Sequence, residues 1–249
     1  MPDFFTFARE DGESIAYCQN IGKGAGILWL GGFRSDMTGS KAAALASWAG
    51  QGGRSFLRFD YFGHGSSSGD FRDGSISRWR DDALAVLDQL TDGPQILVGS
   101  SMGGWIASLL AHHRPERVAG MLLIAPAPDF TEDLIWARMP QDVRDELMAR
   151  GEWFYQGADA YPITRKLIES GRENQVLNRS LAINGPVRIL HGTADIDVPW
   201  KQGLRLFECI DGNATFTLVK GADHRMSEPS QLSLIKQVLE AIITEIEPC

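Results

Sequence analysis

The chain has 249 residues, of which 43% are hydrophobic and 22% are charged, and this composition is typical of a globular protein with a sizeable core. Its net charge of −8 argues against partners such as nucleic acid or an anionic membrane surface. Because no apolar run approaches the ~20 residues of a membrane span, and the N-terminal residues show neither a secretory signal nor an Arg-rich leader, we expect a cytoplasmic protein.

Strands and helices alternate along the first half of the chain. Alternating apolar residues on either side of Asp11 and Gly12 predict an N-terminal β-hairpin. Continuous apolar runs then alternate with Ala-rich or amphipathic segments. The expected strands are residues 3–10, 13–19, 26–32, 55–61, 96–98 and 118–127, and the expected helices are residues 38–53, 76–90 and 102–113. This alternation indicates a mostly parallel sheet with helices on both faces.

The alternation stops after Pro126 and Pro128 and resumes at residue 186. Residues 129–184 are predicted to be helical without strand signals, and they are rich in large apolar side chains. The elements expected after them are strands at residues 186–192 and 214–220 and helices at residues 200–210 and 229–246. We therefore expect one α/β domain over residues 1–249, with an eight-stranded sheet and a small helical cap at about 129–184. A plain pair of connecting helices is the alternative interpretation of that segment.

The sequence GSSMG at residues 99–103 matches the G-x-S-x-G pattern of a nucleophile elbow, in which a serine sits on a tight turn between a strand and a helix. The pattern fits in only one way, because Gly99 and Gly103 flank Ser101 while Ser100 takes the variable position. Small residues at the flanking positions let the strand and the helix pass closely. We therefore predict that Ser101 is the nucleophile and that Ser100 is not.

A serine nucleophile needs an imidazole to take its proton and a carboxylate to orient that imidazole. The chain order that accompanies this elbow is serine, acid, histidine. Two later loops, each directly after an expected strand, contain Asp195 with Asp197 and then His224. Because the carboxyl ends of parallel strands meet at one edge of a sheet, we expect these groups to converge on Ser101. The pattern H-G-x-x-D-x-x-V-P favours Asp195 as the acid over Asp197.

The other histidines are predicted to have structural roles. His191 closes the loop of the acid, and His64 precedes the nucleophile in the chain, which is the wrong order for the base. His112 and His113 end a helix, where a positive charge suits the helix dipole. The histidines show no HxH or HxxxH spacing and the three cysteines are widely spaced, so we expect neither a metal site nor a cofactor.

A tetrahedral intermediate also needs two backbone amides aimed at its oxyanion. One is expected from Met102, directly after the nucleophile, and the other from Phe33 in the loop GGFRSD, with Arg34 as the next choice. The Gly-rich stretch at residues 60–69, DYFGHGSSSG, is predicted to be a structural turn without a chemical role.

Large side chains of the predicted cap are the candidates for substrate binding. The residues chosen are Trp136, Met139, Trp153 and Phe154, with Tyr155 beside them. We expect them to line a slot that holds an apolar acyl group near Ser101. Arg34 and Arg225 flank the oxyanion and histidine positions, where they would either meet a polar or anionic leaving group or form surface ion pairs.

These motifs resemble the α/β-hydrolase superfamily of serine hydrolases over almost the whole chain. The stretches that carry a closer resemblance, to the abhydrolase-domain family of palmitoyl-protein thioesterases and acyl-glucuronide esterases, are SKA after the first loop, RFDYFGHGSSSG, GSSMGGW, VPW after the acid loop and DHRM. The resemblance implies the α/β-hydrolase fold and a catalytic triad of Ser101, Asp195 and His224.

We therefore predict a serine hydrolase that cleaves carboxylic esters or acyl thioesters through an acyl-enzyme. The expected substrates carry an apolar acyl group. They are small-molecule esters or thioesters, among them acyl glucuronides, and also acylated proteins. Two alternatives share the same residues, namely a hydrolase of carbon–carbon bonds in ring-cleavage products and a catalytically silent binding module. Silent members usually lack a triad residue, and none is missing here. The sequence is compatible with a monomer or a homodimer.

Overall fold

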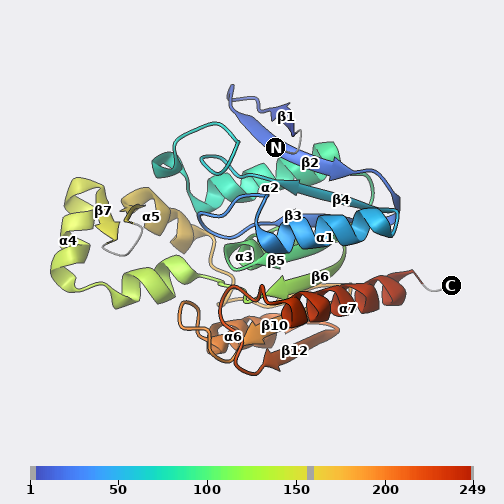
Figure 1. Cartoon of the computed structure of the whole chain (residues 1–249). Coiled ribbons are helices and arrows are strands. Elements are labelled where there is room, and N and C mark those ends of the chain that lie inside the picture. The colour runs from blue at the N-terminus through green and yellow to red at the C-terminus, as the bar shows by residue number, and fades with distance from the viewer. Residues whose placement is uncertain (1–3, 156–159, 248–249) are drawn as a thin grey trace.

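A sheet of eight strands forms the centre of the structure, a computed structural model that describes residues 4–155 and 160–247 (Figure 1). The strands lie in the order β1-β2-β4-β3-β5-β6-β10-β12. Neighbours from β4 to β12 are parallel, whereas β1 and β2 add an antiparallel hairpin at one edge. The strands are β1 (Phe5–Ala8), β2 (Ser14–Asn20), β3 (Lys23–Leu30), β4 (Arg54–Phe59), β5 (Gln95–Ser100), β6 (Val118–Ile124), β10 (Val187–Gly192) and β12 (Ala214–Val219).

Helices cover both faces of this sheet. One face carries α1 (Ser40–Gln51) and α7 (Pro229–Ile246), and the other carries α2 (Ile76–Leu90), α3 (Met102–His113) and α6 (Trp200–Cys209). The prediction of an α/β fold with an eight-stranded, mostly parallel sheet and helices on both faces is confirmed. None of the helices in the described part of the chain is long and apolar enough to cross a membrane.

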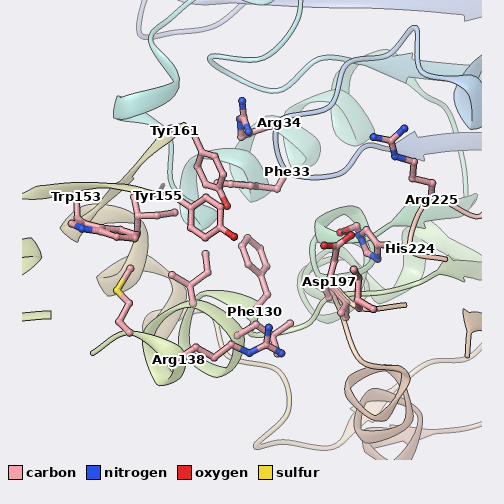
Figure 2. A pocket seen from close by; sticks show the side chains of 18 of the residues that line it. Phe33, Arg34, Phe130, Arg138, Trp153, Tyr155, Tyr161, Asp197, His224 and Arg225 are labelled. Atoms are coloured by element: carbon pink, nitrogen blue, oxygen red, sulfur yellow. Dashed lines mark hydrogen bonds between the residues drawn. The ribbon is translucent and has the colours of Figure 1, made fainter. Parts of the chain in front are cut away.

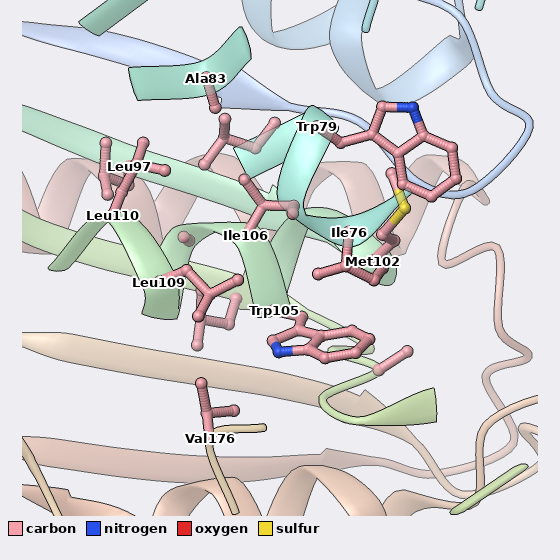
Figure 3. Packing of buried hydrophobic residues seen from close by; sticks show 14 of the residues in the cluster. Ile76, Trp79, Ala83, Leu97, Met102, Trp105, Ile106, Leu109, Leu110 and Val176 are labelled. Atoms are coloured by element: carbon pink, nitrogen blue, oxygen red, sulfur yellow. The ribbon is translucent and has the colours of Figure 1, made fainter. Parts of the chain in front are cut away.

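Two separate cores lie on the two faces, because successive residues of a strand point to opposite sides. On β3, Leu28 and Leu30 join the core beneath α2 and α3, whereas Ile27 and Trp29 join the core beneath α1 and α7. Figure 3 shows the first of these cores, where side chains of α2 and α3 interdigitate above the sheet. Each fully buried Leu or Ile in such a core contributes about 1.5–3 kcal/mol to folding. The sheet is therefore a rigid platform for the loops at its edge.

The segment between β6 and β10, which we call the inserted segment, lies to one side of the sheet, and α4, β7 and α5 are its outermost labelled parts in Figure 1. Its elements are η3 (Thr131–Ile135), a π-helical turn, followed by η4 (Trp136–Arg138), α4 (Gln141–Arg150), β7 (Glu152–Tyr155), β8 (Tyr161–Thr164), α5 (Arg165–Glu173) and β9 (Leu181–Ala182). The expectation of helix without strands is therefore wrong here.

Two short pairings account for this difference. β7 and β8 form an antiparallel hairpin, and β9 pairs with β11 (Ile210–Asp211) outside the inserted segment. Gly151 ends α4 in the left-handed conformation at φ +85°, which favours glycine. The aromatic residues that follow Gly151 have the side chains that a pleated strand prefers. A prediction from local helix propensity takes no account of the segment YPIT, with which these residues pair.

Asp129 joins the two ends of the inserted segment. Its carboxylate accepts hydrogen bonds from the backbone amides of Val176 at 2.9 Å and Leu177 at 3.0 Å. Burial raises the pKa of Asp129 to about 6, against the lowering effect of these two amides. The Ser170 hydroxyl adds a link to α2 by accepting from the Ser77 amide at 2.9 Å. The inserted segment is thus fixed at its base to the sheet and its helices.

Candidate active site

Ser101 occupies the turn between β5 and α3, with backbone angles of φ +55° and ψ −118°. A residue with a side chain rarely adopts a positive φ, so the surrounding structure must hold such a turn in place. Here the Ser101 N–H donates to the Ile124 carbonyl at 3.0 Å, and the Ser101 carbonyl accepts from the Ala127 amide at 3.0 Å. The end of β6 therefore fixes the strained turn.

Close approach of the backbone explains both glycines of the motif. A Cβ at Gly99 would lie 2.4 Å from the carbonyl oxygen of Gly103, and a Cβ at Gly103 would lie 2.0 Å from the carbonyl oxygen of Leu30. These distances are far below van der Waals contact. Only glycine therefore lets β5, α3 and β3 meet at this spacing.

His224 lies between Ser101 and Asp195. Its Nε2 atom is 3.0 Å from the Ser101 Oγ atom, and its Nδ1 atom is 2.7 Å from the Asp195 Oδ2 atom. Because a carboxylate only accepts, Nδ1 carries the hydrogen and Nε2 presents its lone pair to the serine hydroxyl. Ser100 ends β5 and is 6% exposed, whereas the hydroxyl of Ser101 faces the cavity described below. The arrangement can take a proton from Ser101.

Both carboxylate oxygens of Asp195 accept hydrogen bonds. Oδ1 accepts from the backbone amides of Val198 at 2.8 Å and Asp197 at 3.1 Å, and Oδ2 accepts from His224 and from His191 Nε2 at 3.1 Å. Burial by itself raises the pKa of Asp195, but these hydrogen bonds outweigh burial and hold the pKa below its usual range. Asp195 is therefore ionised at neutral pH and can stabilise an imidazolium at His224. Asp197, the alternative acid, contributes its backbone amide to this network.

The remaining histidines lie where the sequence predicts structural roles. His191 Nε2 is also 2.9 Å from the Val198 carbonyl, so this ring closes the loop of the acid. His112 and His113 lie in the last turn of α3. His64 is buried in the turn at residues 60–69. Within residues 4–155 and 160–247, no group of His, Cys, Asp and Glu side chains is arranged to hold a metal ion.

The loop between β3 and α1, residues 31–39, lies against the serine, and we call it the oxyanion loop. A Cβ at Gly32 would be 3.4 Å from the Ser101 Cβ, and Phe33 and Ser101 line the same cavity. Met102 is the first residue of α3, so its amide lies at a helix N-terminus, where the dipole favours negative charge. The Arg34 amide, the second choice from the sequence, already donates to a buried histidine. The geometry thus favours Phe33 over Arg34 as the donor from this loop.

A cavity of about 810 Å³ is lined by Ser101, His224 and the inserted segment (Figure 2). The apolar wall from the inserted segment consists of Ala127, Phe130, Leu134, Ile135, Met139, Pro140, Trp153, Tyr155, Tyr161 and Ile163. Figure 2 shows Trp153 on the side of the cavity away from His224. The charged side chains in the wall are Arg34, Arg138, Asp197 and Arg225. The cavity therefore offers both an apolar surface and an excess of positive charge.

The structure separates the four residues that the sequence suggests for substrate binding. Met139 and Trp153 line the cavity, whereas Trp136 and Phe154 do not. The ring of Trp136 is instead covered by the guanidinium of Arg172, whose Cζ lies 4.6 Å from the ring centroid. A cation–π contact of this kind helps to hold the indole away from the cavity.

The alternation of β7 decides which of its aromatic residues reach the cavity. Trp153 and Tyr155 share the face that lines the cavity, and Phe154 between them points the other way. The same rule places Tyr161 and Ile163 of β8 in the cavity wall. Neither residue is among those that the sequence suggests for substrate binding. Recognition of the hairpin would have found them.

Three further residues of the wall, Phe130, Leu134 and Ile135, come from the start of the inserted segment. Phe130 and Leu134 are four residues apart, which places them on one face of a helical turn, and Ile135 follows Leu134 directly. The four-residue spacing of these apolar side chains is a signal in the sequence from which their place in the wall could be predicted.

Comparison with known proteins gives relatives along almost the whole chain. Residues 32–150 match the family model described as serine aminopeptidase, S33. The mitochondrial palmitoyl-protein thioesterase ABHD10 of Rattus norvegicus is 35% identical over 243 residues, covering 96% of this chain and 82% of the relative. The protein of the same name from Homo sapiens is 33% identical and covers 96% of this chain and 79% of the relative.

Solved structures share the fold as well. A protein from Agrobacterium vitis S4, provisionally described as a hydrolase, superposes with a TM-score of 0.91 at 42% identity, covering 97% of this chain and 98% of that one. The α/β hydrolase domain-containing protein 10 from mouse has a TM-score of 0.91 at 32% identity, covering 98% and 100%. Est1E from Butyrivibrio proteoclasticus, solved with ferulic acid, has a TM-score of 0.80 at 19% identity, covering 95% and 97%, and shares the fold.

Proposed function

The chain belongs to the α/β-hydrolase family of palmitoyl-protein thioesterase ABHD10 and is a hydrolase, and on this premise we propose that it cleaves carboxylic esters or acyl thioesters through an acyl-enzyme. The observation that carries the proposal is the position of His224, which bridges Ser101 at 3.0 Å and Asp195 at 2.7 Å. We assign these three side chains as the catalytic triad, and the amides of Phe33 and Met102 as the oxyanion hole.

Acylation begins when the Ser101 oxygen attacks the carbonyl carbon of the substrate and His224 Nε2 takes the hydroxyl proton. The carbonyl oxygen becomes an oxyanion that accepts from the two backbone amides, while ionised Asp195 stabilises the imidazolium. His224 then gives its proton to the leaving alcohol or thiol as the bond to the acyl carbon breaks. A water molecule repeats these steps on the acyl-enzyme, and Ser101 leaves with the proton from His224.

The cavity supports an apolar acyl group. Apart from Arg138, the side chains that the inserted segment contributes to the cavity wall are aliphatic or aromatic. Each methylene that it removes from water contributes up to about 0.8 kcal/mol. The curated relatives are named palmitoyl-protein thioesterases, so S-acylated proteins are one proposed substrate class for this chain.

Three arginines of the cavity wall, Arg34, Arg138 and Arg225, support a polar or anionic leaving group such as the sugar acid of an acyl glucuronide. Among the described residues, none of the three forms an ion pair with a carboxylate, although the Arg34 guanidinium stacks on the Tyr161 ring. The surface-pair alternative raised by the sequence therefore has less support than a role toward the leaving group.

We further propose that the chain works as one α/β-hydrolase domain with the inserted segment as its cap. The prediction of a cytoplasmic protein stays a prediction, and the mitochondrial names of the curated relatives do not support it.

Labelling with a fluorophosphonate probe tests the proposal directly. The probe forms a bond between the serine oxygen and phosphorus and expels fluoride, so it reports an activated serine. We expect the wild type and the Ser100→Ala variant to be labelled and to hydrolyse p-nitrophenyl esters. The Ser101→Ala variant should lose labelling and at least about 10³-fold in kcat.

The outcomes separate the alternatives. Absence of labelling in the wild type supports the silent binding module and contradicts the proposal. Labelling without turnover of any ester or thioester favours the carbon–carbon hydrolase. Loss of labelling in Ser100→Ala with retention in Ser101→Ala shows that the nucleophile is misassigned.

A further inference from the structure

A buried histidine accepts a hydrogen bond from the oxyanion loop, at the residue next to the proposed oxyanion donor. The backbone N–H of Arg34 donates to His64 Nε2 at 3.1 Å, across 30 residues of sequence. We propose that His64 is a positioning residue, which holds the oxyanion loop so that the Phe33 amide points at the oxyanion formed on Ser101. This inference rests on the proposed function and adds a role for a ring that does not touch the substrate.

The hydrogen-bond partners of His64 fix its tautomer. Its Nδ1 atom lies 3.1 Å from the Phe62 carbonyl oxygen, which can only accept, so Nδ1 carries the hydrogen. Nε2 of the neutral ring is then a lone pair, and it accepts from the Arg34 amide. Phe62 is itself anchored, because its N–H donates to the Asp82 carboxylate at 2.9 Å and its carbonyl accepts from Trp79 Nε1 at 3.0 Å. The ring is therefore held from the side opposite the loop.

The surroundings of His64 keep the ring neutral. It is 4% exposed and lies edge-on to the rings of Tyr61, Phe71 and Trp79. Burial lowers the pKa of His64 to about 4 against the raising effect of the Phe62 carbonyl, and the positive charge of Arg34 lowers it further. The acceptor lone pair is therefore present over the whole neutral pH range.

The backbone of the oxyanion loop needs such a restraint. Arg34 adopts a positive φ of +60°, which a residue with a side chain adopts only at an energetic cost. The peptide unit that carries the Arg34 N–H also carries the Phe33 carbonyl, so its orientation constrains ψ of Phe33 directly. The Arg34 guanidinium is held at the other end, 4.4 Å from the centroid of the Tyr161 ring.

The same Gly-rich turn holds the oxyanion loop at a second point. The Asp60 carboxylate accepts from the Met37 amide at 2.6 Å and from the Ser66 amide at 2.8 Å. Asp60 and His64 both belong to the turn at residues 60–69, for which the sequence suggests no chemical role. The geometry assigns this turn to the support of the oxyanion loop.

A pair of substitutions separates the two hydrogen bonds of the ring. In His64→Asn the side-chain amide sits near the position of Nδ1, so it can donate to Phe62 but does not reach Arg34. In His64→Gln the longer side chain can present its oxygen near the position of Nε2, so it can accept from Arg34. Both variants lose the aromatic packing, and comparison of the two therefore isolates the contact with the loop.

The readouts are kcat and KM for a p-nitrophenyl ester and the inhibition constant of an apolar trifluoromethyl ketone, which forms a tetrahedral oxyanion adduct with the serine. Removing an oxyanion donor altogether lowers kcat about 10²–10³-fold. A donor that is present but poorly oriented should lower kcat by a smaller factor. We expect His64→Asn to lower kcat about 10- to 100-fold and to weaken the ketone in parallel, with KM within about twofold of the wild type. His64→Gln should keep kcat within about threefold.

Ser68→Ala is the matched control for destabilisation of the turn. The Ser68 hydroxyl accepts from the Ser14 amide at 2.7 Å and does not contact the oxyanion loop. This variant should lower Tm while kcat and the inhibition constant stay unchanged. If kcat falls equally in His64→Asn and His64→Gln, or falls in neither, the inference is overturned. If His64→Asn does not fold, a folded His64→Gln that loses more than about tenfold in kcat overturns it as well.

The proposed function fails separately. A wild type that the fluorophosphonate does not label at Ser101 overturns both proposals. Labelling of Ser101 together with equal kcat in the two His64 variants overturns the positioning role alone.

Discussion

Replacing Asp195 with asparagine changes one atom and should disable the base. The carboxylate accepts four hydrogen bonds, two from backbone amides on Oδ1 and two from histidines on Oδ2. The backbone amides cannot reverse their polarity, so the oxygen of an asparagine will face them and its NH₂ group will face His224. His224 then keeps its hydrogen on Nε2, where the lone pair for Ser101 is needed.

The size of the effect follows from two terms. In the productive tautomer the Nδ1 hydrogen of His224 would face the NH₂ group of the asparagine, which is also a donor. A buried polar group is then left without a hydrogen bond, at a cost of about 1–3 kcal/mol. The imidazolium formed in the transition state also loses its partner charge, worth about 4 kcal/mol at ~4 Å and an effective dielectric of ~20. The side chain of Asp195 is fully buried, so solvent does not replace that charge. Together these terms predict a fall in kcat of roughly 10⁴-fold.

The assay is steady-state hydrolysis of a p-nitrophenyl ester, with thermal unfolding as the test that Asp195→Asn is folded. Asp197→Asn is the control, because Asp197 contributes only its backbone amide to the acid, and it should stay within about fivefold in kcat. A folded Asp195→Asn variant within about 100-fold of the wild type refutes the reasoning. Equal losses in the two variants would show that the acid is shared.

Three other predictions concern packing, substrate and pH. Gly103→Ala should lower the free energy of unfolding in urea by about 3 kcal/mol or more, because its Cβ would lie 2.0 Å from the Leu30 carbonyl oxygen. The control Gly52→Ala, whose Cβ would have contacts of 3.6 Å, should change it by less than about 1 kcal/mol. Equal effects would contradict the close approach at Gly103. Along a series of acyl chains from acetyl to palmitoyl, kcat/KM should peak at medium or long chains, and a steady fall beyond acetyl would contradict an apolar acyl site. Because the folded protein binds the proton of Asp129 more tightly than the unfolded chain does, its contribution to stability should decrease as pH rises from about 4 to about 6. Urea unfolding at pH 4 and pH 7 should show a loss of stability in the wild type that is up to about 3 kcal/mol larger than in Asp129→Asn, and an equal loss would contradict the raised pKa.

The parts of the site that the sequence could predict depend on short motifs and on one rule of topology. The elbow around Ser101 is a local pattern, and the glycines that identify it are required by contacts of about 2 Å. Asp195 and His224 follow their strands directly, and parallel strands bring their carboxyl ends to one edge. These positions do not depend on how distant side chains pack.

The parts that the sequence could not predict depend on distant partners. β7 and β8 have four residues each, too few for a periodicity to stand out, and they are stable only as a pair. The contact between His64 and the Arg34 amide spans 30 residues and involves a backbone group, which leaves no pattern of side chains to recognise. Trp136 lies outside the cavity, where two arginines cover its ring, whereas its hydrophobicity alone predicts a place in the cavity wall.

The ring of Phe33 connects the inserted segment to the proposed oxyanion hole. Its centroid is 5.4 Å from that of Phe130 and 5.7 Å from that of Tyr161, both in the cavity wall, and 5.7 Å from that of Trp79 in α2. An acyl group that fills the cavity therefore packs against side chains that also hold Phe33, the proposed donor to the oxyanion. Interactions far from the reacting carbon accelerate a reaction only when they are stronger in the transition state than in the ground state. A link through Phe33 makes this possible, since better packing of the acyl group restrains the donor that acts only on the oxyanion. Acyl-chain length should therefore affect kcat as well as KM.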